Sequence, residues 1–116
     1  MSRTAPYVPE RGDVVWLDFD PQAGHEQAGR RPALVLSPAA YNGKTSLMLC
    51  CPVTKQAKGY PLEVPVAPAA GAQLTGVVLA DQVRCLDWKR RNATKFAAVT
   101  AQSALGVSMK VKALIP

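Results

Sequence analysis

Short apolar runs separated by proline, glycine and polar residues recur along most of the chain and constrain its fold more than any other feature. Residues 14–19 are apolar on both side-chain phases, which predicts a strand buried on both faces of a sheet. Residues 33–36 repeat that pattern directly after Pro32. The proline does not argue against a strand here, because strands tolerate proline at their start. Residues 46–54 place alternate apolar side chains on one face, and Thr54 emerges on the other at the end of the run. These patterns predict three β-strands.

The middle of the chain predicts shorter strands, one of them at a sheet edge. In residues 60–66, Pro61 and Pro65 fall on the same phase, so both missing N–H donors point to one side. A strand of this kind stops pairing on that side, which predicts an edge strand. Further strands are predicted at 76–84, where Asp81 and Gln82 interrupt the apolar pattern, and at 86–88 and 95–99.

The last segment changes its period. From Ala101 to Ile115, apolar residues recur in three- and four-residue steps, which predicts a C-terminal helix with Thr100 as its cap. Several short strands followed by one helix predict a mainly β fold, a small curved antiparallel sheet or partial barrel with a C-terminal α-helix against it. We expect residues 1–116 to form a single domain, with residues 1–11 poorly ordered.

Composition limits the cellular setting and the chemistry. No apolar run is long enough for a membrane span or a signal peptide, so a cytoplasmic protein is expected. Cys50, Cys51 and Cys85 are an odd number, with no CxxC spacing and only one histidine in the chain. We therefore expect reduced core thiols, no metal site and no cofactor.

Charge points to a polyanionic partner. The formal net charge is +6, and residues 84–95 hold five basic residues against one acid. The run at 89–91 also fits a solvated turn between two strands. Charge alone therefore leaves nucleic-acid binding as one of two interpretations.

Residues 24–37, GHEQAGRRPALVLS, place the only histidine, a glutamate, a glutamine and two arginines directly before an apolar run. The connection between the first two predicted strands is about a dozen residues long, and loops of that length in compact domains are usually functional or disordered. Gly24 and Gly29 give this loop the freedom to fold over a ligand.

These residue types suit RNA cleavage without a metal. Such cleavage needs a base for the ribose 2'-OH, cationic donors for the phosphorane oxygens and an acid for the leaving oxygen. Arginine matches phosphate with its planar fork, Glu26 is able to accept a proton, and Thr54 is able to orient a phosphate. Each also has a structural interpretation, since Arg31 could pair with Glu26 and Thr54 could simply end its strand.

The order of the segments resembles the MazF family of toxin endoribonucleases, which is related to the PemK and Kid toxins. Three blocks carry the resemblance: GDVVWLDFDPQAGHEQAGRRPALVLSP, YNGKTSLMLCCPVTKQAKGYPLEV and GVVLADQVRCLDWKRR. The resemblance implies an SH3-like barrel with a C-terminal helix and a homodimer. It also implies ribosome-independent, sequence-specific cleavage of single-stranded messenger RNA, leaving 2',3'-cyclic phosphate and 5'-OH ends.

The resemblance also assigns roles to residues. It places catalysis on Arg31 and Thr54, with Glu26 second, and leaves open whether Glu26 or Arg31 is the base. The candidate RNA contacts are Gln27, His25, Arg30, Lys55, Lys58, Tyr60, Asp81, Gln82, Arg84, Lys89, Arg90 and Arg91. Trp88 and Tyr60 are candidate stacking platforms, although Trp88 also fits a core or dimer-interface position.

One departure and two alternatives remain. In the Kid branch an arginine and an aspartate on the strand aligned with LADQV are catalytic, whereas Leu79 occupies the arginine's place here and Asp81 remains. Asp81 is therefore expected to bind substrate or to form a turn.

The family implies a MazE-like antitoxin with an acidic tail across the RNA groove. The alternatives are a gyrase-binding poison of the CcdB type and a plain nucleic-acid-binding barrel.

Overall fold

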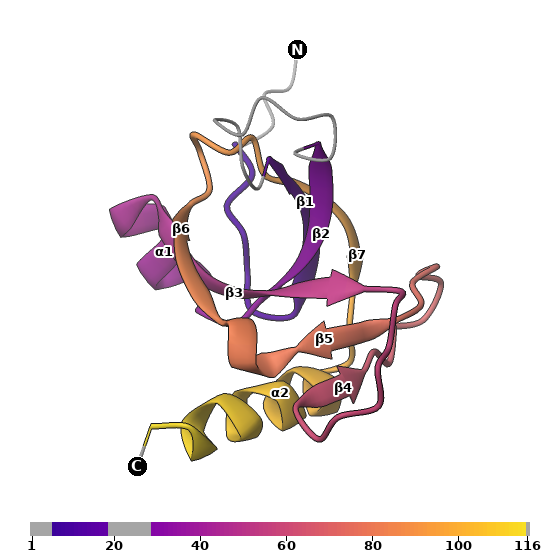
Figure 1. Ribbon diagram of the computed structural model, residues 1–116. Coiled ribbons are helices and arrows are strands. Elements are labelled where there is room, and N and C mark those ends of the chain that lie inside the picture. Colours follow the sequence, from indigo (N-terminus) through magenta and orange to yellow (C-terminus); the bar gives the residue numbers. More distant parts are fainter. Residues whose placement is uncertain (1–5, 19–28, 116) are drawn as a thin grey trace.

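The computed structural model describes residues 6–18 and 29–115, and an antiparallel sheet dominates it (Figure 1). The strands are β1 (Asp13–Asp18), β2 (Arg30–Val35), β3 (Leu47–Thr54), β4 (Glu63–Pro65), β5 (Val77–Leu79), β6 (Arg84–Asp87) and β7 (Thr94–Ala98). The helices are α1 (Ala39–Thr45), the 3-10 turn η2 (Ala80–Gln82) and α2 (Ala101–Ala113). The mainly β fold with a C-terminal helix is confirmed.

The strand order is β4-β5-β3-β2-β1-β7, and β6 pairs with β3 beside β5. Among the described strands, β4 pairs with β5 alone and lies at the edge, as the two prolines predict. The predicted strand 76–84 is instead two strands, because η2 interrupts it at the polar residues Asp81 and Gln82. The next predicted strand, 86–88, is the end of β6 and the turn that follows it.

Two buried clusters lie on opposite faces of the sheet. Val14 belongs to one cluster and Val15 and Leu17 to the other, so these residues bury both faces of β1, as predicted. Trp16 is 37% exposed, against that prediction, and Phe19 lies outside the described residues. Helix α2 covers the first cluster through Ala104 and Val107, and Figure 1 shows it lying across β4 and β5. Its cap is the predicted one: the Thr100 hydroxyl accepts from the Ser103 N–H at 3.1 Å.

Helix α1 was not predicted, because its sequence AAYNGKT has no apolar period. Buried Asn42 holds it: its amide donates to the carbonyl oxygens of Pro9 (2.8 Å) and Ser37 (2.9 Å). The same contacts tie down part of the N-terminal segment that we expected to be poorly ordered. Within it, Pro9 is fully buried and the Tyr7 hydroxyl donates to Asp13 at 2.6 Å.

The cysteine prediction is right for two residues and wrong for the third. Cys50 and Cys51 are buried free thiols, one in each cluster, whereas Cys85 is exposed. The register explains the difference, since Cys85 pairs with Leu49, which is itself 43% exposed. In the part of the chain that the structure describes, no helix combines the length and apolar character needed to cross a membrane.

Candidate active site

One hollow of about 1010 Å³ lies where the ends of β1, β2 and β3 meet the loop at 72–75. The polar and charged side chains that line it include Arg31, Thr54, Lys55, Gln73, Thr75, Gln82 and Arg84. Both residues that the sequence ranked first for catalysis, Arg31 and Thr54, are therefore in the same site. We call this hollow the groove.

Strand pairing explains why Arg31 and Thr54 meet. The β2–β3 ladder runs antiparallel from Val35↔Cys50 to Ala33↔Pro52. Continuing that register by two residues places Arg31 opposite Thr54, just beyond the last paired residues. Arg31 is exposed and Thr54 half-buried, so the two side chains present a cation and a hydroxyl to the groove.

The Thr54 hydroxyl is oriented by its own loop. Its oxygen accepts a hydrogen bond from the Gln56 N–H at 3.1 Å. A hydroxyl has two lone pairs and one proton, so this bond leaves the proton available for another acceptor. Thr54 is consequently set up as a donor, which is the role that an anionic oxygen of RNA requires.

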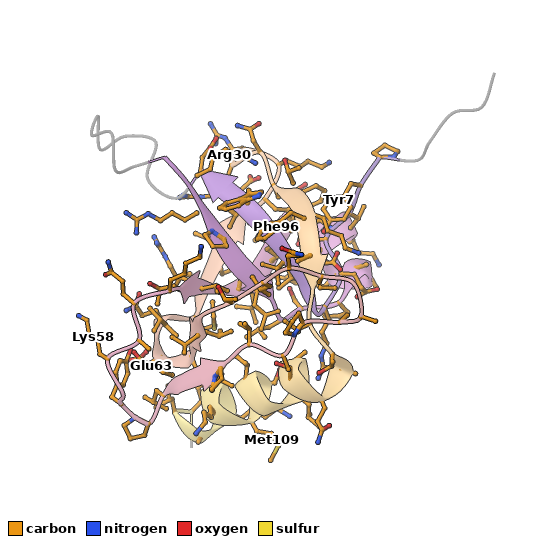
Figure 2. The ribbon with its side chains drawn as sticks, turned by 90° about the vertical axis from the view of Figure 1, so that its right-hand side faces the viewer. Tyr7, Arg30, Lys58, Glu63, Phe96 and Met109 are labelled. Carbon is orange, nitrogen blue, oxygen red and sulfur yellow. The ribbon has the colours of Figure 1, made fainter. Side chains whose placement is uncertain are left out.

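Two carboxylates fix the loop that follows Thr54. Glu63 accepts from the backbone N–H groups of Lys58 (2.8 Å) and Gly59 (2.8 Å), and Figure 2 shows Lys58 extending away from the sheet beside it. The Tyr60 hydroxyl donates to Asp81 at 3.1 Å. Tyr60 and Asp81, both predicted to contact RNA, are thus brought together by a hydrogen bond between their side chains.

The two adjacent arginines of β2 point to different surroundings, as alternation along a strand requires. Arg31 lines the groove, while Arg30 forms an ion pair with Asp18 at 2.9 Å. Hydrogen bonds from Asn92 and Arg30 hold the pKa of the Asp18 carboxyl below its usual value, against a smaller opposing effect of desolvation. Arg30 is therefore engaged by the protein itself.

The basic run at 89–91 forms the turn between β6 and β7 and is not among the residues that line the groove. Lys89 lies 5.5 Å from the centre of the Trp88 ring, and Arg91 donates to the Asp18 carbonyl oxygen at 2.9 Å. The Arg90 N–H donates to the Asp87 carboxylate at 2.9 Å. Of the basic residues at 84–91 that were predicted to contact RNA, Arg84 is the one that lines the groove.

Of the two interpretations of Trp88, the structure supports the core position. Trp88 is 6% exposed, packs in a core cluster and donates its indole N–H to the Asn42 carbonyl oxygen at 2.9 Å. Trp16 and Phe96 form an aromatic pair instead, with ring centres 4.5 Å apart and planes 21° apart, and both line the groove. The sequence pattern missed this pair because it assigned Trp16 to a strand buried on both faces.

Three predicted residues, Glu26, His25 and Gln27, lie outside the described residues. Among residues 6–18 and 29–115, no group of three or more histidine, cysteine, aspartate or glutamate side chains is arranged to hold a metal ion.

Comparison with known proteins identifies the family. The family of PemK-like, MazF-like toxins of type II toxin–antitoxin systems matches residues 10–115. The endoribonuclease toxin MazF of Escherichia coli K12 is 50% identical over 109 residues, which are 94% of this chain and 96% of that protein. The chain belongs to the PemK-like and MazF-like toxins.

Solved structures of this toxin family agree with the fold. MazF from Deinococcus radiodurans has a TM-score of 0.82 at 56% identity, covering 95% of this chain and 98% of that one. A MazE–MazF complex from the same organism has a TM-score of 0.81 at 50% identity, covering 95% and 97%. The endoribonuclease PemK of Escherichia coli is 38% identical over 95 residues, which are 78% of this chain and 69% of that protein.

Proposed function

We propose that this PemK-like and MazF-like toxin is an endoribonuclease that cleaves single-stranded RNA, chiefly messenger RNA, at a specific sequence without a metal ion or the ribosome. The observation that carries the proposal is the placement of Arg31 and Thr54 in one groove. The curated relatives add support, since MazF and PemK of Escherichia coli are both named endoribonucleases.

In the proposed reaction the ribose 2'-oxygen attacks the adjacent phosphorus while a base takes its proton. The bond from phosphorus to the 5'-oxygen breaks, and the leaving oxygen gains a proton, which gives a 2',3'-cyclic phosphate and a 5'-OH. Arg31 stabilises the charge on the phosphorane oxygens, because its guanidinium stays ionised and matches two oxygens at once. The Thr54 hydroxyl donates to a phosphate oxygen. Glu26 is the proposed base.

RNA binding is proposed to follow the groove. Arg31, Lys55 and Arg84 supply positive charge along it, and Gln82 offers an amide for base edges. Trp16 and Phe96 are each about one-third exposed as residues, at 37% and 36%, and their rings are proposed to stack with an unpaired base. The basic turn at 89–91 extends the attraction for phosphate beyond the groove.

We further propose a cytoplasmic homodimer that is held inactive by a MazE-like antitoxin. One of the two Deinococcus radiodurans structures contains MazE together with MazF. An acidic tail of the antitoxin would lie along the basic groove and compete with RNA. The outward side of α2 exposes Leu105 (48%) and Met109 (61%), an apolar surface suited to a second copy.

The test is a gel assay of the purified protein with EDTA and a long single-stranded RNA. Arg31→Ala removes the proposed catalytic cation, and Lys44→Gln removes one exposed charge on α1 as the matched control. We expect discrete fragments with 5'-OH ends from the wild type and the control but not from Arg31→Ala. Intact RNA from the folded wild type would contradict the proposal and favour a poison that binds a protein such as gyrase.

The role of Glu26 has its own test, a profile of cleavage rate against pH for Glu26→Gln. Loss of the acidic limb of the profile supports Glu26 as the base, because the limb reports the ionisation of that base. An unchanged profile removes Glu26 from this role.

A further inference from the structure

Arg30 is bound by two other segments of the chain. One guanidinium nitrogen donates to the Asp18 carboxylate at 2.9 Å. The other donates to the Trp16 carbonyl oxygen at 3.2 Å, the Asn92 carbonyl oxygen at 2.5 Å and the Thr94 hydroxyl at 3.0 Å. Arg30 thereby links the end of β1, the start of β2 and the turn that leads into β7.

The same acceptors are themselves cross-linked. The second oxygen of Asp18 accepts from the Asn92 amide at 2.8 Å, and the Asp18 N–H donates to the Arg91 carbonyl oxygen at 3.0 Å. We call the set of Arg30, Asp18, Asn92 and Thr94 the clamp. Figure 2 shows Arg30 at one end of the sheet, above Phe96.

The clamp lies where β2 extends beyond its ladder with β3. Pairing between β2 and β3 ends at Ala33↔Pro52, whereas pairing between β1 and β2 continues through Leu17↔Arg31 to Asp18↔Arg30. The backbone of Arg31 is therefore paired with β1 directly next to the pair that carries the clamp, and a change in the clamp acts on its position.

We propose that Arg30 is a positioning residue that fixes the backbone of Arg31 in the groove and makes no contact with RNA phosphate. The inference rests on the proposed function of Arg31. Its basis is the binding of both terminal nitrogens of the Arg30 guanidinium by protein acceptors, on the side of β2 opposite to Arg31. The carboxylate of Asp18 beside it also opposes the approach of a phosphate.

Three variants separate positioning from phosphate binding. Arg30→Gln removes both the positive charge and the planar set of guanidinium donors, whereas Arg30→Lys keeps the charge and loses the planar donors. Asp18→Asn weakens the clamp and leaves every arginine and lysine in place. Lys44→Gln on α1 is the charge-matched control, and thermal unfolding reports whether each variant is folded.

Two measurements are made on an oligonucleotide that carries the mapped cleavage site. The first is the single-turnover cleavage rate at saturating protein. The second is the Kd for the same oligonucleotide with a 2'-deoxy sugar at the cleaved nucleotide, measured over a range of KCl concentrations. The slope of log Kd against log salt counts phosphate contacts, at about 0.7 per contact for a single strand.

Positioning predicts a fall in the cleavage rate of about 10- to 100-fold in all three variants, since small displacements of a catalytic group have effects of that size. The salt slope stays at the wild-type value, and Arg30→Lys fails to restore the rate. The double variant Arg30→Lys with Asp18→Asn is no slower than the slower single variant, because both changes break the same clamp.

The opposite pattern overturns the inference. A phosphate contact predicts a salt slope smaller by about 0.7 in Arg30→Gln, restored in Arg30→Lys, and tighter binding in Asp18→Asn. If Arg30→Gln fails to fold, Arg30→Lys and Asp18→Asn decide the question. A wild-type chain that leaves RNA intact overturns the proposed function and this inference together, whereas an active wild type with altered salt slopes overturns the inference alone.

Discussion

Gly76 lies directly against the backbone of Thr54. A Cβ at position 76 would stand 3.0 Å from the Thr54 carbonyl carbon and closer still to the carbonyl oxygen, and Gly76 has a φ of +118°. A side chain therefore cannot be added without moving one of the two segments. The contact joins the loop at 72–75, which lines the groove, to the proposed catalytic threonine.

We expect Gly76→Ala to lower both cleavage and stability. The added methyl group forces the loop away from β3, and a positive φ is itself unfavourable for alanine by about 1–2 kcal/mol. Urea unfolding and the single-turnover cleavage rate measure the two effects. Gly71→Ala is the matched control, because Gly71 has a φ of +84° but nothing within 4 Å of the added Cβ. Equal losses in the two variants would mean that the contact with Thr54 has no effect of its own.

The Thr54 hydroxyl predicts a contrast between two substitutions. Thr54→Ser keeps both the bond from the Gln56 N–H and the proton that remains to be donated, so cleavage should stay within about threefold of wild type. Thr54→Val loses the hydroxyl and should lower the cleavage rate by about 100-fold, in the range found for the loss of one donor to a developing oxyanion. An active Thr54→Val would exclude the hydroxyl from catalysis.

Most of the sheet was predictable because its strands follow local patterns. The apolar run at 14–19 predicted the burial of Val14, Val15 and Leu17. Pro61 with Pro65 marked the sheet edge, since the missing N–H groups are a local property. Helix α1 was not predictable in this way. Its hydrogen bonds run from Asn42 to Pro9, 33 residues away, and no local pattern reports such a contact.

The groove was predictable only in part. Arg31 and Thr54 were identified by residue type and family resemblance, but their meeting depends on the β2–β3 register. The Trp16 and Phe96 stack depends on β1 lying beside β7, and an alternating pattern cannot show which strands are neighbours. Arg30 was a candidate RNA contact, and its partner Asp18 became visible only through strand pairing.

The cysteines predict a pattern of thiol reactivity. Burial raises the pKa of the Cys50 and Cys51 thiols to about 12, whereas Cys85 is exposed. With iodoacetamide at about pH 8, the native protein should be alkylated at Cys85 first, and the denatured protein at all three cysteines. Rapid labelling of Cys51 in the native protein, read by mass spectrometry, would contradict the buried position.

The same shifts set a pH dependence of stability. Between the ordinary thiol pKa of 9.0 and about 12, the folded state keeps protons that the unfolded state loses. The free energy of unfolding should therefore fall as pH rises through this range, by up to about 1.4 kcal/mol per pH unit for each thiol. Urea unfolding at pH values between 8 and 10 should show a shallower fall for Cys51→Ala than for the control Cys85→Ala. Identical slopes in the two variants would contradict the prediction.

Trp88 should affect stability and not RNA binding. Its indole N–H donates to the Asn42 carbonyl oxygen in a buried setting, so Trp88→Phe should lower the free energy of unfolding by about 1–3 kcal/mol. The Kd for a non-cleavable oligonucleotide should stay unchanged, since Trp88 packs in the core cluster away from the groove lining. Trp16→Ala is the matched comparison: it removes a partly exposed ring from the groove, and should weaken RNA binding with a smaller loss of stability. The prediction fails if Trp88→Phe weakens RNA binding as much as Trp16→Ala does, because that result would return Trp88 to the binding surface.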